Sequence, residues 1–262
     1  MNLNLSDKTA LVCGSTQGIG WASAFELALM GANVTLMARN EASLQKKLAE
    51  LPKNETQTHR YIVADFSHPD SVSATIKSYL TEYPEVHILV NNSGGPAGGA
   101  IIDELPEKFV RIFEQHLVCN QILVQACVPS MISSGFGRIV NIISVSVKQP
   151  ILGLGVSNTV RWAVASWSKT LSKEIAKHGI TVNNVLPGYT LTARLDQVND
   201  MRASNDGVSK AEVEKALTDT IPTKRFATAE EVAAAVAFLC SPAAASINGI
   251  NVPVDGGLAA SL

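Results

Sequence analysis

The chain has little that would anchor it in a membrane, link it by disulfides or attract it to nucleic acid. Its four cysteines lie in apolar segments without Cys-x-x-Cys spacing, so we expect buried free thiols, no disulfide and no metal site. Lys and Arg form no long run and the net charge is −2, which disfavours nucleic-acid binding. No apolar run approaches ~18 residues, and the first residues combine no basic stretch with an apolar one. We therefore expect a soluble, cytoplasmic protein.

What the chain does have is a large apolar content in a moderate length. Of its 262 residues, 46% are hydrophobic, enough for a sizeable core. No low-complexity linker or internal repeat divides it. We therefore expect a single domain over residues 1–262.

A short apolar run, Thr9–Cys13, breaks at once into a glycine-rich loop that precedes an Ala/Leu-rich helix. Glycine permits a tight turn and lets a phosphate approach the backbone N–H groups at the positive end of the helix. A plain strand-to-helix turn would have a similar sequence. The loop consists of Gly14, Ser15, Thr16, Gln17, Gly18, Ile19 and Gly20.

Strands and helices alternate along the whole chain, which predicts an α/β fold with parallel strands and right-handed crossovers, a doubly wound Rossmann-type sheet of about seven strands. The exception is the long polar segment 189–226. The predicted strands are 9–13, 32–38, 60–64, 86–91, 138–143, 181–186 and 249–254, and the predicted helices are 22–30, 41–51, 70–83, 107–133, 157–177 and 231–240.

Several motifs resemble those of the short-chain dehydrogenase/reductase family over nearly the whole chain. The glycine loop resembles its phosphate loop, and the turn Asn91-Asn92-Ser93-Gly94 resembles its Asn-Asn-Ala-Gly motif. Pro187-Gly188 and Val254-Asp255-Gly256-Gly257 match two later landmarks. The resemblance implies a dinucleotide site and a substrate-covering role for 189–226, and it is nearest to 3-oxoacyl-carrier-protein reductases.

The cofactor determinants favour NADP(H) over NAD(H). Ala38 ends the second strand where an acid would bind ribose hydroxyls, and Arg39 suits a 2′-phosphate, although a solvated loop arginine is the alternative. By resemblance Asp65, followed by Phe66, contacts adenine, or else it is a residue of a helix N-cap region. Thr192 lies where relatives contact the nicotinamide amide, or else it forms a turn.

The catalytic positions depart from the family. The family uses Asn, Ser, Tyr and Lys; Ser144 matches the Ser, but Ser157 and Arg161 occupy the Tyr-x-x-x-Lys positions and His116 that of the Asn. Asn120 lies one helical turn further along, so a local shift would present an amide there.

The chemical consequence concerns the proton. Serine is far less acidic than a phenol, and Arg161 does not yield a proton, although it can hydrogen-bond ribose. His116, with an ordinary pKa near ~6.5, and Tyr189 are substitute acids; a packed helix residue is the alternative for His116.

The sequence therefore supports two functional hypotheses. The first is an NADP(H)-dependent oxidoreductase acting on a carbonyl, alcohol or acyl substrate with a changed proton donor. The second is a cofactor-binding sensor or partner subunit without turnover. We favour the enzyme, because Ser144, Thr192 and a long substrate segment would have little use together otherwise. The resemblance also implies a homo-oligomer, tetramer or dimer, in which a partner covers Val124, Cys127 and Trp167.

Overall fold

The computed structural model describes residues 1–261, which form one seven-stranded parallel sheet with the strand order β3-β2-β1-β4-β5-β6-β7. The α/β doubly wound fold predicted from the sequence is confirmed. Strand order reverses between β1 and β4, where such sheets bind ligands. The strands are β1 Thr9–Cys13, β2 Asn33–Ala38, β3 Arg60–Val63, β4 Ile88–Asn91, β5 Gly137–Ile142, β6 Ile180–Pro187 and β7 Asn251–Val254.

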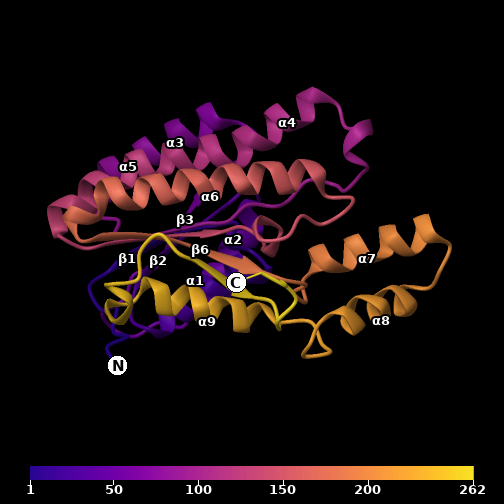
Figure 1. The fold of residues 1–262 in the computed structure, drawn as a ribbon. Helices are drawn as coiled ribbons and strands as arrows, with labels where there is room; N and C mark the ends of the chain where they lie inside the picture. Colours follow the sequence, from indigo (N-terminus) through magenta and orange to yellow (C-terminus); the bar gives the residue numbers. More distant parts are fainter. Residues whose placement is uncertain (262) are drawn as a thin grey trace.

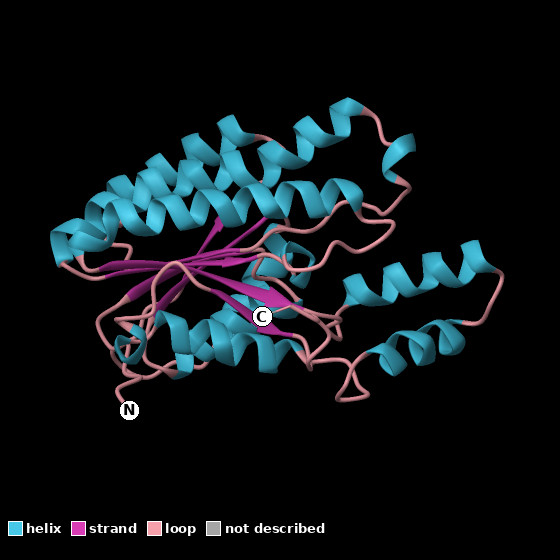
Figure 2. Cartoon of the chain, viewed as in Figure 1, coloured by secondary structure: helices cyan, strands magenta, loops and turns pink. Residues whose placement is uncertain are grey.

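Helices cover both faces of this sheet (Figures 1 and 2). On one face lie α1 Gly18–Leu29, α2 Glu41–Glu50 and α9 Ala229–Cys240, which pack on a core with buried residues from β1, β2, β4, β5 and β6. On the other lie α3 Pro69–Glu82, α4 Pro106–Phe113, α5 Cys119–Ser134 and α6 Gly155–Ile175. All four cysteines are buried and unpaired in these two layers, as expected.

The helix predicted over residues 107–133 contains a break in its regular hydrogen bonding. Between α4 and α5, residues Glu114–Val118 form a π-helical turn that carries His116. A π turn contains an extra residue, so it rotates the side chains after it relative to those before it. This local shift brings His116 and Asn120 to the same pocket.

The same helical run, Pro106–Ser134, is by length and composition a candidate to cross a membrane, with a mean hydropathy of 1.3 in its most apolar window. The sequence analysis counted only unbroken apolar runs and found none near ~18 residues. Gln, Asn and Ser interrupt this run, so that count did not include it. The run packs against α3 and α6, and a third of its apolar window is buried within the chain.

The polar segment 189–226 is mostly helical, which its composition did not indicate. It contains α7 Ala193–Asp206 and α8 Lys210–Thr220, which pack together and project beyond the sheet (Figure 1). The local caps explain these helices: Thr192 accepts a hydrogen bond from the backbone of Leu195, and Ser209 and Glu212 form a capping box. Gly207, with φ +67, ends α7.

Candidate functional site

The glycine loop follows β1 and is held by an asparagine from the next motif. Gly14 has φ +58, a conformation that favours glycine, and a Cβ there would lie 2.8 Å from the carbonyl oxygen of Asn92. The Asn92 side chain donates to the carbonyls of Cys13 and Gly14 at 3.2 and 3.3 Å. A Cβ on Gly20 would overlap the Gly14 carbonyl oxygen, so the loop must lie directly against the helix start. The loop therefore tolerates no side chain at Gly14 or Gly20.

The N-terminus of α1 is open to a ligand. Gln17 is its N-cap residue, and its side chain makes no capping hydrogen bond. The first N–H groups of a helix attract anions, so this geometry fits a pyrophosphate. Buried Ser15 ties the loop to β2 by accepting from the backbone N–H of Met37 at 2.9 Å. Thr16 and Ile19 are partly buried beside it.

Arg39 and Asp65 follow β2 and β3, at the same edge of the sheet as the glycine loop after β1. Hydrogen bonds from Ser67 lower the pKa of Asp65 against the opposing effect of burial, and the charge of Arg39 adds to the lowering. Arg39 itself lies directly after β2. The Ser67 backbone donates to the Asp65 carboxylate at 2.9 Å, so Asp65 also shapes its own turn. Phe66 is buried in the core.

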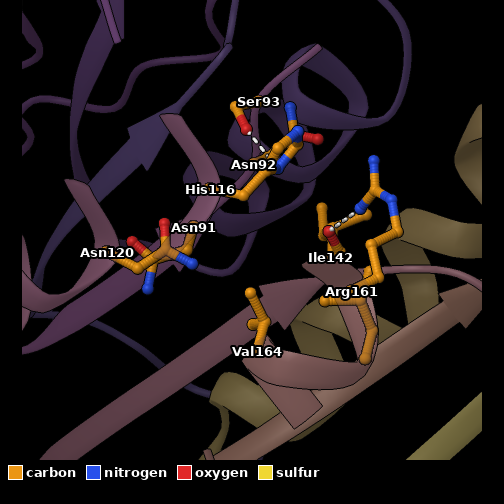
Figure 3. A pocket seen from close by; sticks show the side chains of 9 residues that line it. Asn91, Asn92, Ser93, His116, Asn120, Ile142, Arg161 and Val164 are labelled. Atoms are coloured by element: carbon orange, nitrogen blue, oxygen red, sulfur yellow. Dashed lines mark hydrogen bonds between the residues drawn. The ribbon is translucent and has the colours of Figure 1, made fainter. Parts of the chain in front are cut away.

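A small pocket lies beyond the end of β4, lined by residues from four separate segments (Figure 3). It measures about 10 Å³, roughly the space of one water molecule. Ser93 Oγ and His116 Nδ1 are 2.8 Å apart, while the buried Nε2 of His116 and Oδ1 of Asn91 have no hydrogen-bond partner among the described residues. The lining residues are Asn91, Asn92, Ser93, His116, Asn120, Ile142, Ile143, Arg161 and Val164.

The pKa of His116 differs from the ordinary value assumed in the sequence analysis. Burial lowers it to about 3, and the positive charge of Arg161 adds to the effect. His116 is therefore neutral at pH 7. A neutral imidazole cannot act as the imidazolium acid that the sequence analysis considered. The expectation based on a pKa near ~6.5 was therefore wrong.

An amide ladder across four strands fixes the Asn91 side chain. Asn91 donates to Asn141 at 2.8 Å, Asn141 donates to Asn184 at 2.9 Å, and Asn184 donates to Asn251 at 2.7 Å. Each pair is also paired in the backbone register of the sheet. The Nδ2 of each asparagine donates to the asparagine on the next strand. Asn91 is the first in this series, so its side-chain carbonyl receives no hydrogen bond from the ladder and lies without a partner among the described residues, beside the pocket.

Ser144 lies just after the carboxyl end of β5, and Ser157 and Arg161 lie on α6. Arg161 Nε donates to Ser157 Oγ at 3.3 Å, and its Nη1 donates to the carbonyl of Ile142 at 3.1 Å. Ser144 Oγ accepts from the backbone N–H of Ser146 at 3.0 Å. Each serine thus accepts a hydrogen bond and keeps its own O–H available. Burial, followed by the charge of Arg194, lowers the pKa of Arg161 to about 10, so it remains cationic at neutral pH.

Two later motifs lie near this end of the sheet. Pro187 ends β6, and Gly188 packs against Asp255, where a Cβ would lie 2.8 Å from the Asp255 Cβ. Thr192 reaches the glycine loop, since a Cβ on Gly18 would lie 3.2 Å from its Cγ2. The start of α7 therefore borders the same cleft as the phosphate loop.

The sequence analysis missed Arg194, because nothing in its local pattern marks it. Arg194 donates to the carbonyl of Pro96, so it bridges α7 to the loop after β4. Gly94 in that loop has open space at its Cβ position. Among residues 1–261, no group of three or more His, Cys, Asp or Glu side chains is arranged to hold a metal ion.

Comparison with known proteins identifies the family. Residues 14–259 match the family model described as Enoyl-(Acyl carrier protein) reductase. The chain is 33% identical over 251 residues to the granaticin polyketide synthase putative ketoacyl reductase 1 of Streptomyces violaceoruber, covering 95% of this chain and 92% of that protein. It is 32% identical over 256 residues to the 3-oxoacyl-acyl-carrier-protein reductase FabG of Vibrio cholerae, covering 98% and 99%.

Solved structures give the same result. The L-sorbose reductase of Gluconobacter frateurii, complexed with NADPH and L-sorbose, has a TM-score of 0.93 and 30% identity, with both chains covered fully. A variant of the actinorhodin polyketide ketoreductase with NADPH has a TM-score of 0.88 and 32% identity, with 97% of each chain covered. The chain belongs to the short-chain dehydrogenase/reductase family, in its enoyl-(acyl carrier protein) reductase-like branch.

Proposed function

We propose that this chain is an NADP(H)-dependent oxidoreductase that interconverts a small carbonyl compound and its alcohol. The observation that carries the proposal is the shared cleft: the cradle of Gly14, Gly18 and Gly20 at one end, and Ser144 with Arg161 at the other. Such a cleft at the point of strand reversal can hold a dinucleotide with its reactive end beside the serine and the arginine.

The residues present fit NADP(H). The uncapped N-terminus of α1 suits the pyrophosphate, and Arg39 suits the 2′-phosphate because its planar fork binds such a group with charge-assisted hydrogen bonds. Asp65 would contact the adenine, and Asn91, Ser93 and Gly94 would hold the nicotinamide end together with Thr192. NADPH in the relatives' structures supports this choice.

Two groups of this chain act on the substrate oxygen. NADPH, when bound, would supply a hydride to the carbonyl carbon, which would leave negative charge on the oxygen. Ser144 donates its free O–H to that oxygen, and Arg161 stabilises the charge without giving up a proton. The hydrogen bond to the Ile142 carbonyl holds Arg161 beside the pocket, and the hydrogen bond from the Ser146 N–H holds Ser144 after the end of β5.

The proton donor differs from that of the family. We assign Ser157 and Arg161 to the positions of the family's Tyr and Lys, where Ser157 accepts from Arg161 and is too weakly acidic to replace a phenol. Neutral His116 orients Ser93 and the pocket rather than donating. Tyr189, partly buried after the end of β6 against Phe226, is the remaining candidate donor on the substrate side.

One observation favours a second function, a binding protein without turnover. None of the three residues at the altered catalytic positions, His116, Ser157 and Arg161, readily gives up a proton at neutral pH. A protein that binds NADP(H) without turnover, as a sensor or a partner subunit, would need no such acid. We rank it second because Ser144 retains a free donor in the cleft.

We also propose how the chain assembles and where it acts. The α7–α8 hairpin covers the substrate, and the protein is a cytoplasmic homo-oligomer, tetramer or dimer. Val124 and Cys127, expected at the interface, are instead buried in the core of the chain. The exposed large apolar residues of α4, α5 and α6 are Val110, Phe113, Ile132 and Trp162. We propose these residues for the interface in place of Val124 and Cys127.

The test is an NADPH titration followed by single-turnover assays with ketones, oxo acids and 3-oxoacyl thioesters. The proposal expects NADPH binding and loss of NADPH absorbance with at least one class. Ser144→Ala should lower the rate about 10²-fold and Ser157→Ala less than about tenfold. Binding without turnover for any class would favour the second function, and no NADPH binding would exclude both.

A further inference from the structure

Two arginines border the loop after β4 without a carboxylate partner. Arg161 approaches from α6, and a Cβ on Gly95 would lie 3.6 Å from its Nη2. Arg194 approaches from the first turn of α7 and donates to the carbonyl of the next residue, Pro96. Among the described residues, neither arginine takes part in an ion pair.

The two guanidinium groups have donors to spare. Arg161 uses Nε and Nη1 for Ser157 and Ile142, which leaves Nη2 without a hydrogen bond beside Gly95. Arg194 uses one Nη2 donor, out of the five N–H groups of a guanidinium. The neighbouring position above Gly94 is open, with no atom within 4 Å of where a Cβ would be. An acidic group that enters beside Gly95 and Pro96 would lie near both guanidinium groups.

The electrostatics of this arrangement are unfavourable unless a ligand supplies negative charge. Each arginine is partly buried, and they lie close enough for the charge of Arg194 to disfavour that of Arg161. Arg194 also stands at the positive end of a helix, where cations are destabilising. The nearby acid on α7, Asp196, pairs with Lys210 at 3.1 Å instead. Figure 3 shows Arg161 across the pocket from Asn91 and Asn120, which are neutral amides.

We propose that the substrate carries an anionic group, a carboxylate or a phosphate, which Arg194 binds with the help of Arg161. The site takes an oxo acid or a phosphorylated carbonyl compound rather than a neutral ketone or a carrier-bound thioester. This inference rests on the proposed function, and it gives Arg194 the role of a specificity-determining residue. The planar fork of arginine matches both anions through paired hydrogen bonds.

The experiment measures probe binding to the protein saturated with NADP⁺, by calorimetry. The probes are 3-oxobutanoate against its neutral N-acetylcysteamine thioester, and dihydroxyacetone phosphate against dihydroxyacetone. We expect one of the two anions to bind at least tenfold more tightly than its neutral partner, and which one does so identifies a carboxylate or a phosphate. Arg194→Gln should weaken binding of the preferred anion roughly 10- to 100-fold and leave the affinity for the neutral probes unchanged.

Two further variants separate binding from folding. Arg194→Lys keeps the charge but loses the fork, so it should retain part of the anion preference, and Arg202→Gln on the same helix should retain all of it. NADPH affinity and melting temperature should be unchanged in all three variants. Normal NADPH binding with no anion preference would overturn the inference alone. A loss of NADPH affinity in Arg194→Gln would assign the residue to the cofactor and also overturn it. No NADPH binding by the parent would overturn the proposed function and this inference together.

Discussion

At the scale of single residues, the proposed preference for NADP(H) depends on Arg39. It lies directly after β2 and follows Ala38, so no acid stands where ribose hydroxyls would be held. Arg39→Ala should weaken NADPH binding by about 1.5–3 kcal/mol, the range for charge-assisted hydrogen bonds, with little effect on NADH. Fluorescence titration with both cofactors measures this. Equal losses for the two would mean that Arg39 does not contact the 2′-phosphate.

His116 makes stability depend on pH. Its pKa is lowered from 6.5 to about 3, so between these values the unfolded chain binds a proton that the folded chain does not. The contribution of neutral His116 is complete above pH 6.5 and is lost as the pH falls toward 3. At pH 5 the loss is about 2 kcal/mol relative to pH 7.

Chemical denaturation at pH 7 and pH 5, with His116→Gln as the comparison, measures this contribution. His59 and His87 also have lowered pKa values, from burial, so both proteins lose stability on acidification. The parent should lose about 2 kcal/mol more than the variant. An identical loss in both proteins would show that His116 is not held neutral.

At the scale of elements, the amide ladder joins β4 to β7 through buried side chains. Asn141 is fully buried and also donates to Ser168 at 3.3 Å. Asn141→Ala would leave the Asn91 amide and the Asn184 carbonyl without partners, so it should cost about 2–4 kcal/mol of folding free energy. Exposed Asn205→Ala on α7 should cost under about 0.5 kcal/mol. A loss below about 1 kcal/mol for Asn141→Ala in urea denaturation would mean that the ladder contributes little.

The elements also show where sequence reasoning succeeded. Apolar runs and glycine turns marked all seven strands, because the five central strands are buried and mostly apolar, while the edge strands β3 and β7 are short and partly buried. The α7–α8 hairpin was missed because its helices bury little within the chain, and only Thr192, Ser209 and Glu212 mark them by capping. The π turn at Glu114–Val118 has no sequence pattern of its own.

The candidate site was predictable where motifs are local. Asn91, Ser93 and Arg161 line one pocket, and the glycine loop lies against Asn92 at its edge, because strand ends meet at one edge of a parallel sheet. The pKa of His116 was not predictable, because it depends on burial and on a charge from another helix. Arg194 was missed for the same reason: its relation to Pro96 joins residues 98 positions apart.

At the scale of the whole molecule, the helical layer of α4, α5 and α6 leaves apolar side chains exposed. Trp162 is 49% exposed, and Phe113 is 41% exposed. A homo-oligomer would bury them, so light scattering at micromolar concentration should give at least twice the chain mass of 27.8 kDa. Trp162→Glu should lower that mass, while Val208→Glu on the distant hairpin should not. A mass near 27.8 kDa for the parent would refute the assembly.

The most direct test of a reductase cleft with a changed proton donor is single-turnover NADPH oxidation by the parent and by the Ser157→Tyr, Arg161→Lys double variant. The double variant places a tunable phenol beside a cation, so it should reduce at least one class of carbonyl compound, among oxo acids, simple ketones and 3-oxoacyl thioesters, at least tenfold faster than the parent, with NADPH affinity within about threefold. No gain in rate with NADPH binding intact would contradict the account and would support a protein that binds the cofactor without turnover.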